Sequence, residues 1–150
     1  MADIKTKEAR SKNMAAIRSK DTKPELYLRK KLFAMGLRYR KNVNEIVGHP
    51  DLYFAKYKTA LFVNGCFWHR HASCKYAYMP KSNIEKWEKK FSDNIKRDAV
   101  VEAELQSKGI KRIVVWECTI KKMQRDEVYE KEILSHIQHL LANSVCSIEL

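Results

Sequence analysis

The chain has 150 residues, 45% of them hydrophobic, which is enough for one domain with a buried core and short for two domains of usual size. Lys and Arg outnumber Asp and Glu by 30 to 18, a formal charge of +12 that favours polyanions as partners. No targeting segment or apolar run of membrane length is present, so we expect a cytoplasmic protein that acts on nucleic acid rather than on an acidic membrane surface.

The first predicted element is a helix over residues 22–36. Thr22 and Glu25 have the spacing of a capping box, and Gly36 stops the helical pattern. Apolar side chains share one face of this helix: Leu28, Leu32 and Met35. Three short runs rich in aromatic and β-branched residues then predict strands over residues 37–43, 51–55 and 58–64. A tight turn is expected between the last two strands.

A long helix is predicted next, over residues 82–109. Ser82 and Glu85 repeat the capping-box spacing, and Gly109 ends the pattern. Its apolar stripe consists of Ile84, Trp87, Phe91, Ile95, Val101 and Leu105. A strand over residues 111–117 and a helix over about residues 126–142 follow. This order of elements predicts an α/β fold, with a mixed sheet flanked by helices in one domain.

The stretch FVNGCFWHRHASCKY, residues 62–76, gathers cysteines and histidines directly after the third strand. In a reducing compartment such a cluster favours a metal over disulfides. Cys66, His71 and Cys74 leave the third strand, and Cys118 ends the fourth, so the four converge if these strands are neighbours. Three thiolates and an imidazole suit a closed structural zinc site. The alternative is a set of small buried residues with a surface histidine; Cys146 is expected to be a spectator.

With those four assigned to zinc, His69 remains, near the carboxylate of Asp51 at the start of the second strand. Since the second and third strands form a hairpin, Asp51 and the loop that carries His69 should meet at one end of the sheet. A hard divalent cation needs oxygen ligands, which Asp51 and a backbone carbonyl near Val63 could supply. Glu25 is either a second acid at this site or only the helix cap.

Several motifs together resemble the very short patch repair (Vsr) DNA mismatch endonucleases, over about residues 8–118. They are RSKNM, DTKPE, GHPD, FVNGCFWHRH, WEKKFSDNIKRD and VVWEC. The resemblance implies a restriction-endonuclease-like fold of the PD-(D/E)xK superfamily. It also implies an activity, namely nicking one DNA strand on the 5′ side of the T in a T:G mismatch left by deamination of 5-methylcytosine, which initiates very short patch repair.

The resemblance also assigns roles to individual residues. It implies Mg²⁺ held by Asp51 and the Val63 carbonyl, His69 as the general base that activates water, and Glu25 as an outer-shell carboxylate. It implies structural zinc on the four residues named above: Cys66, His71, Cys74 and Cys118. The sequence departs from the family pattern at Asn64, at His49 and in one extra residue between His71 and Cys74.

A DNA-binding surface follows from the same resemblance. Phe67, Trp68 and Trp87 would form a wedge between base pairs beside the mismatch, and Met14 of the N-terminal segment, residues 1–20, would enter from the other groove. Without the resemblance, Trp87 on its apolar stripe would be read as a core residue. The remaining implied DNA contacts are Lys90, Asn94 and Arg97.

We therefore expect a monomeric, Mg²⁺-dependent, zinc-stabilised nicking endonuclease formed by residues 1–150 as a single domain. Residues 120–150 are read as a packing helix and tail. A functional link to a cytosine-5 DNA methyltransferase would accompany such an activity. Two alternatives remain: a restriction-type nuclease without mismatch preference, and a zinc-stabilised DNA-binding module without catalysis. The second would need neither Asp51 nor His69.

Overall fold

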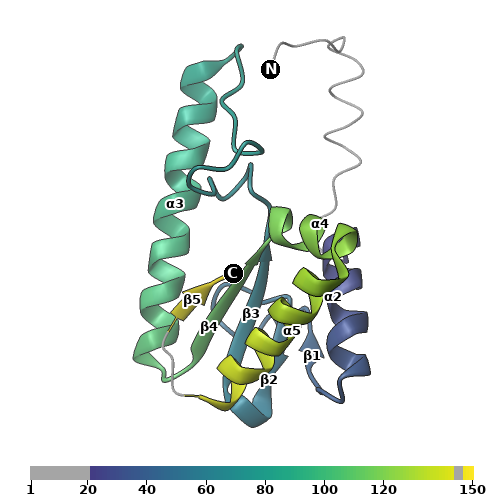
Figure 1. Ribbon diagram of the computed structural model, residues 1–150. Coiled ribbons are helices and arrows are strands. Elements are labelled where there is room, and N and C mark those ends of the chain that lie inside the picture. Colours follow the sequence, from purple (N-terminus) through teal and green to yellow (C-terminus); the bar gives the residue numbers. More distant parts are fainter. Residues whose placement is uncertain (1–20, 144–146) are drawn as a thin grey trace.

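The computed structural model describes residues 21–143 and 147–150 (Figure 1). In chain order the elements are α2 (Lys23–Ala34), β1 (Arg40–Lys41), β2 (Leu52–Phe54), the 3-10 helix η1 (Ala55–Tyr57), β3 (Thr59–Asn64), α3 (Ile84–Ser107), β4 (Lys111–Trp116), α4 (Glu117–Arg125), α5 (Glu127–Ala142) and β5 (Ser147–Glu149). The expected mixed sheet flanked by helices is confirmed.

Within the described residues the sheet has five strands in the order β1-β2-β3-β4-β5. The pairs β1–β2 and β2–β3 are antiparallel, and β3–β4 and β4–β5 are parallel. Figure 1 shows α3 on one side of the sheet and α2, α4 and α5 on the other. β3 and β4 are neighbours, as the convergence of the four cysteine and histidine side chains required.

The main core lies between the sheet and the α2, α4 and α5 layer. Leu61 on β3 and Ile113 and Val115 on β4 face this layer, because alternate residues of a strand point to the same face. Phe62 and Val114 point to the other face, where they pack together in a smaller apolar cluster. The two faces therefore serve different purposes: one carries the bulk of the core, and the other receives α3 and the loop after β3.

The start of α2 agrees with the sequence pattern. Thr22 is the N-cap, with its hydroxyl oxygen accepting a hydrogen bond from the Glu25 N–H at 3.5 Å, and Pro24 occupies the first turn. The expected tight turn between β2 and β3 is η1, closed by Lys58 in the left-handed region at φ 48°. The first predicted strand is only two residues long, β1 (Arg40–Lys41). It ends there because Asn42 has φ 50° and is not extended.

The start and the apolar stripe of α3 differ from expectation. Asn83, not Ser82, is the N-cap, and it makes no side-chain cap hydrogen bond. Phe91 and Leu105 are buried, but Ile84 and Ile95 are 46% and 52% exposed. The reason is visible in Figure 1: the N-terminal half of α3 extends past the end of the sheet and lies beside the loop of residues 65–83 instead.

The C-terminal part holds two elements that the sequence did not predict. The strand β4 ends at Trp116 and Glu117 opens α4, so Cys118 lies in the first turn of a helix rather than at a strand end. β5 adds a parallel edge strand, and the Leu150 N–H donates to the Val114 carbonyl at 2.8 Å. α5 begins as expected, with Asp126 capping it through the Tyr129 N–H. No helix in the described ranges is both long and apolar enough to cross a membrane.

Candidate functional site

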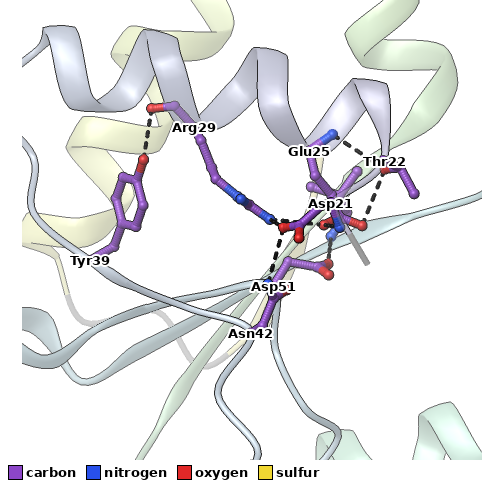
Figure 2. Close-up of polar contacts among 8 residues, drawn as sticks. Asp21, Thr22, Glu25, Arg29, Tyr39, Asn42 and Asp51 are labelled. Atoms are coloured by element: carbon purple, nitrogen blue, oxygen red, sulfur yellow. Dashed lines mark hydrogen bonds and ion pairs between the residues drawn. The ribbon is translucent and has the colours of Figure 1, made fainter. Parts of the chain in front are cut away.

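A carboxylate cluster lies where α2 meets the start of β2 (Figure 2). Asp51 precedes β2, and its Oδ2 accepts a hydrogen bond of 2.6 Å from the Val63 N–H on β3. Glu25, 4% exposed in the first turn of α2, is close enough to Asp51 to perturb it by charge and by hydrogen bonding. The structure therefore brings together the three residues expected at a cation site.

Burial raises the pKa of Asp51 to about 7, with the Val63 N–H acting in the opposite direction and the Glu25 carboxylate adding repulsion. A carboxyl group with this pKa loses its proton readily when a cation binds in place of the proton. The contact seen with Val63 is through its N–H. Because the N–H and C=O of one extended residue point to the same neighbouring strand, we expect its carbonyl on the Asp51 side as well.

These residues fit a hard divalent cation by their chemistry. Carboxylate and carbonyl oxygens are the ligands that Mg²⁺ takes in proteins, with water completing the shell. Both oxygens of Glu25 are already engaged: Oε1 accepts from the Thr22 hydroxyl at 3.2 Å, and Oε2 accepts from the Asp21 N–H at 2.9 Å. Asp51 accepts one backbone hydrogen bond, through Oδ2, and its carboxyl group faces Glu25 across the site.

His69 lies in the loop directly after β3. Its N–H donates to the Gly65 carbonyl at 3.1 Å, so the loop folds back to the end of β3 that also receives Asp51. The His69 Nδ1 is 2.7 Å from Oδ2 of Asp98 on α3. An ionised carboxylate can only accept, so Nδ1 carries the hydrogen in this pair and Nε2 of the neutral ring keeps a free lone pair.

Asp98 is a residue that the sequence reasoning missed. It is 29 positions from His69, and its contact depends on the docking of α3 against the loop. A signal was present: Asp98 follows Asn94 by four residues on the same helical face, and the Asn94 amide donates to the Trp68 carbonyl at 2.9 Å. Both residues lie in the WEKKFSDNIKRD motif that carries the resemblance.

The cysteine and histidine cluster forms at the other side of the same loop. The ligand atoms of Cys66, His71, Cys74 and Cys118 all lie within 4.8 Å of one another. The Cys118 Sγ is 3.4 Å from Nδ1 of His71, and the Cys118 N–H donates to the Cys66 Sγ at 3.4 Å. This cluster could hold a metal ion.

The donor set of this cluster suits zinc. Zinc–sulfur bonds of about 2.3 Å at tetrahedral angles separate two sulfurs by about 3.8 Å, which is within the spread of the cluster. Burial raises the pKa of the Cys66 thiol to about 12, so without a cation this sulfur stays protonated. The His71 ring stacks on Trp116 at 4.2 Å, and the Trp116 indole N–H donates to Glu149 of β5 at 2.9 Å. The imidazole is therefore held in place from outside the cluster.

An aromatic cluster joins the loop to α3. The Phe67 ring contacts Trp68 at 5.1 Å, Trp87 at 5.4 Å and the buried Phe91 at 5.2 Å, all nearly perpendicular. Phe67, Trp68 and Trp87 are only partly buried. Trp87 is thus neither a core residue nor free in solvent: it packs on Phe91 on one side and remains accessible on the other.

The other expected DNA contacts lie along the same helix. The Lys90 ammonium sits 5.0 Å from the Trp68 ring, and Arg97 is exposed. Further exposed basic side chains on α3 are Lys86, Lys89 and Lys96. Met14 and the N-terminal segment lie outside the described residues, as does Cys146. Exposed Lys and Arg side chains, interspersed with Glu85, Glu88 and Asp93, therefore border the aromatic cluster.

Comparison with known proteins decides the family. The sequence model of the family described as DNA mismatch endonuclease Vsr matches residues 2–75. The type II nicking enzyme V.NmeAIP of Neisseria meningitidis serogroup A is 50% identical over 121 residues, covering 81% of this chain and 86% of the relative. The DNA mismatch endonuclease Vsr of Escherichia coli is 31% identical over 150 residues, covering 100% of this chain and 94% of the relative. The chain belongs to the Vsr family.

Membership of the Vsr family confirms the resemblance carried by the sequence motifs. A third relative, the type II nicking enzyme V.XorIIP of Xanthomonas oryzae, is 37% identical over 134 residues and is covered over 98% of its length. These relatives are named as a DNA mismatch endonuclease and as nicking enzymes, so a nuclease activity is supported for this chain.

Proposed function

We propose that this chain is a DNA mismatch endonuclease that nicks one strand 5′ of the T in a T:G mismatch, the lesion left by deamination of 5-methylcytosine, and so initiates very short patch repair. One observation carries the proposal. The buried Glu25, the half-buried Asp51 and a histidine paired with Asp98 lie at the same end of β3, beside a loop whose aromatic side chains border exposed Lys and Arg side chains of α3.

In the proposed reaction His69 is the general base. Its Nε2 takes a proton from water, the water oxygen forms a bond to phosphorus, and the bond from phosphorus to the leaving sugar oxygen breaks, with that oxygen taking a proton from solvent. Asp98 accepts from Nδ1 and stabilises the imidazolium that results. Asp51 and the Val63 carbonyl would hold Mg²⁺, with Glu25 as an outer-shell carboxylate. When bound, the cation supplies neutralisation of charge on the phosphate oxygens.

The same proposal gives the other clusters their roles. Zinc on Cys66, His71, Cys74 and Cys118 would fix both ends of the segment that carries the aromatic residues. Phe67, Trp68 and Trp87 would unstack the base pairs beside the mismatch, with Met14 on the opposite groove. A T:G pair costs less to unstack than a matched pair, so the deformability of the DNA contributes to selectivity. Lys90, Asn94 and Arg97 would border the DNA.

We further propose a restriction-endonuclease-like fold of the PD-(D/E)xK superfamily, in one domain that acts as a monomer alongside a cytosine-5 methyltransferase. The mixed sheet with Asp51 at the entry of β2 and the parallel β3–β4 pair support that fold. The alternative of a nuclease without mismatch preference is favoured by the relatives that are named type II nicking enzymes.

The test is nicking of three duplexes of one sequence, containing T:G, T:A or C:G at the central position, with Mg²⁺ present. We expect cleavage 5′ of the mismatched T and little cleavage of the matched duplexes. Equal cleavage of all three would favour the restriction-type nuclease. Tight binding without cleavage in any duplex would favour the non-catalytic DNA-binding module.

The first prediction concerns the His69–Asp98 pair. His69→Ala should lower the nicking rate by about 10²–10⁴-fold, as expected for a lost general base. Asp98→Asn should lower the rate by a smaller factor, because the base remains but is less well oriented. In the His69→Ala background the Asp98→Asn change should add almost nothing, since Asp98 acts through His69.

A matched control for Asp98 is available on the same helix. Asp93 is exposed on α3 and loses the same charge in Asp93→Asn. Single-turnover nicking with saturating enzyme measures all four variants. If Asp98→Asn lowered the rate equally with and without His69, Asp98 would not act through the histidine.

The second prediction separates mismatch recognition from general DNA affinity. Replacing Phe67 and Trp68 together by Ala should remove most of the preference for T:G over T:A duplex. Contacts to phosphate alone do not distinguish one base pair from another. The dependence of residual binding on salt should stay nearly unchanged. Phe33→Ala on α2, 54% exposed and outside the cluster, is the control. An unaltered T:G preference in the double variant would reject the wedge.

A further inference from the structure

Arg29 is a charged, buried side chain that the proposed mechanism does not use. It lies one turn after Glu25 on α2 and is 7% exposed. Its Nη2 is 2.5 Å from Oδ1 of Asp21 and 3.2 Å from Oε2 of Glu25. A buried guanidinium is retained only where carboxylates compensate it, and here one nitrogen serves two of them.

The contacts of Arg29 continue to Asp51 (Figure 2). The Asn42 amide donates to the same Asp21 Oδ1 at 3.1 Å, and the Asn42 N–H donates to the Asp51 carbonyl at 3.0 Å. The Asp21 N–H in turn donates to the Glu25 carboxylate. Arg29 thus lies at the centre of a network that reaches the backbone of Asp51 on one side and the side chain of Glu25 on the other.

The charges of this network are nearly balanced for one divalent cation. When Asp21, Glu25 and Asp51 are all ionised, the three carboxylates and the Arg29 guanidinium carry a net formal charge of minus two. One Mg²⁺ neutralises that charge. Without Arg29 the net charge would be minus three. The Glu25 carboxylate would also lose the ion pair that holds its Oε2 against Arg29.

We propose that Arg29 is a positioning residue of the nuclease site. By holding Glu25 and Asp21, it keeps Glu25 in the outer shell and leaves Asp51 as the carboxylate that binds the cation directly. The inference rests on the proposed function, because it concerns the cation site assigned there. It adds a residue whose effect is on the geometry and charge of that site rather than on substrate.

The test compares Arg29→Gln with Lys30→Gln, which removes the same charge from the next, exposed position of α2. Mg²⁺ is titrated calorimetrically into the DNA-free protein. Removal of a cation beside the site should tighten Mg²⁺ binding several-fold, because a repulsive charge is gone. The nicking rate at saturating Mg²⁺ should nevertheless fall about tenfold or more, because Glu25 is no longer held. Lys30→Gln should match the unmodified protein in both measurements.

A second measurement needs neither metal nor DNA. The melting temperatures of Glu25→Gln, Arg29→Gln and the double variant form a mutant cycle in metal-free buffer, and we expect losses that are clearly less than additive. Arg29→Lys covers the case in which Arg29→Gln does not fold. It keeps the charge, so Mg²⁺ affinity should stay within about twofold, while nicking falls because the shorter lysine side chain does not carry its ammonium to the position of Nη2 between the two carboxylates.

Each outcome decides between the two proposals. An additive mutant cycle, or an Arg29→Gln variant that binds Mg²⁺ and nicks as Lys30→Gln does, would overturn the positioning role. An unmodified protein that neither binds Mg²⁺ nor nicks would refute the proposed function and the cation role of Arg29 with it. In that case a non-additive cycle would still establish the Arg29–Glu25 contact as structural.

Discussion

Replacement of Asp51 by Asn is expected to lower Mg²⁺-dependent nicking of a T:G duplex by about 10³-fold or more, because several kcal/mol of charge stabilisation depend on the bound cation. Binding of the duplex should be unchanged or slightly tighter, since the variant removes a negative charge near phosphate. Full nicking activity in Asp51→Asn would place the cation site elsewhere.

At pH 8, where Asp51 is ionised, the same substitution should make the metal-free protein more stable toward unfolding. The folded-state pKa of Asp51 is raised from 3.8 to about 7, so the folded chain binds more protons than the unfolded chain between these values. Stability is therefore lost as pH rises from 3.8 to about 7, by at most about 4 kcal/mol. Asn is never charged, and we expect that part of the pH dependence to disappear.

Denaturant unfolding in chelator at pH 5 and pH 8 measures this effect. The unmodified protein should lose stability between the two values, and Asp51→Asn should lose less. Glu132→Gln, an exposed charge change on α5, is the control and should behave like the unmodified protein. If Asp51→Asn were destabilised at pH 8, the carboxylate would be held by compensating contacts rather than strained by burial.

Loss of one thiol of the cysteine and histidine cluster is the other large expected effect. Purified protein should contain close to one zinc per chain, and Cys118→Ser should lose both the metal and cooperative unfolding, because metal binding at such a site is part of folding. Three of the four predicted ligands, Cys66, His71 and Cys74, lie in the segment after β3, so loss of the metal would release this segment from Cys118 on α4. Elemental analysis and thermal unfolding by circular dichroism measure the two effects.

Cys146→Ser is the matched control, since Cys146 is outside the predicted ligand set. It should retain zinc and the unfolding temperature. A Cys118→Ser protein that unfolds at the temperature of the control would show that the cluster is packing rather than a metal site. Chelation of the unmodified protein should reproduce the Cys118→Ser result, which separates loss of metal from loss of a buried side chain.

The parts of the structure that were predictable are those set by local sequence. Thr22 caps α2 and Asp126 caps α5 because capping depends on residues three positions apart. β3 and β4 were found as short apolar runs, and their adjacency brings Cys118 to the loop that carries Cys66. The convergence of the four cysteine and histidine residues therefore followed from the strand order, although α4 rather than β4 carries Cys118.

The parts that were missed depend on long-range packing. The nine residues of α4 are too few to show a helical period, and Glu117 follows the apolar run of β4 with no Gly, Pro or other turn residue between them. Arg29 reads in sequence as one more of the basic residues of α2, and only the fold shows that it is buried beside carboxylates. Asp98 likewise acquires its partner from the docking of α3.

The two cysteines that bracket Phe67, Trp68 and His69 have a consequence for the entropy of DNA binding. With Cys66 and Cys74 bound to one ion, the intervening segment would be ordered before any duplex arrives, and Arg70 strengthens this by donating to the Phe67, Ala77 and Tyr78 carbonyls. The segment would then lose its conformational entropy when the metal binds, and not when the DNA binds. Recognition would then proceed by bending of the duplex around a stiff protein surface rather than by folding of the loop onto it.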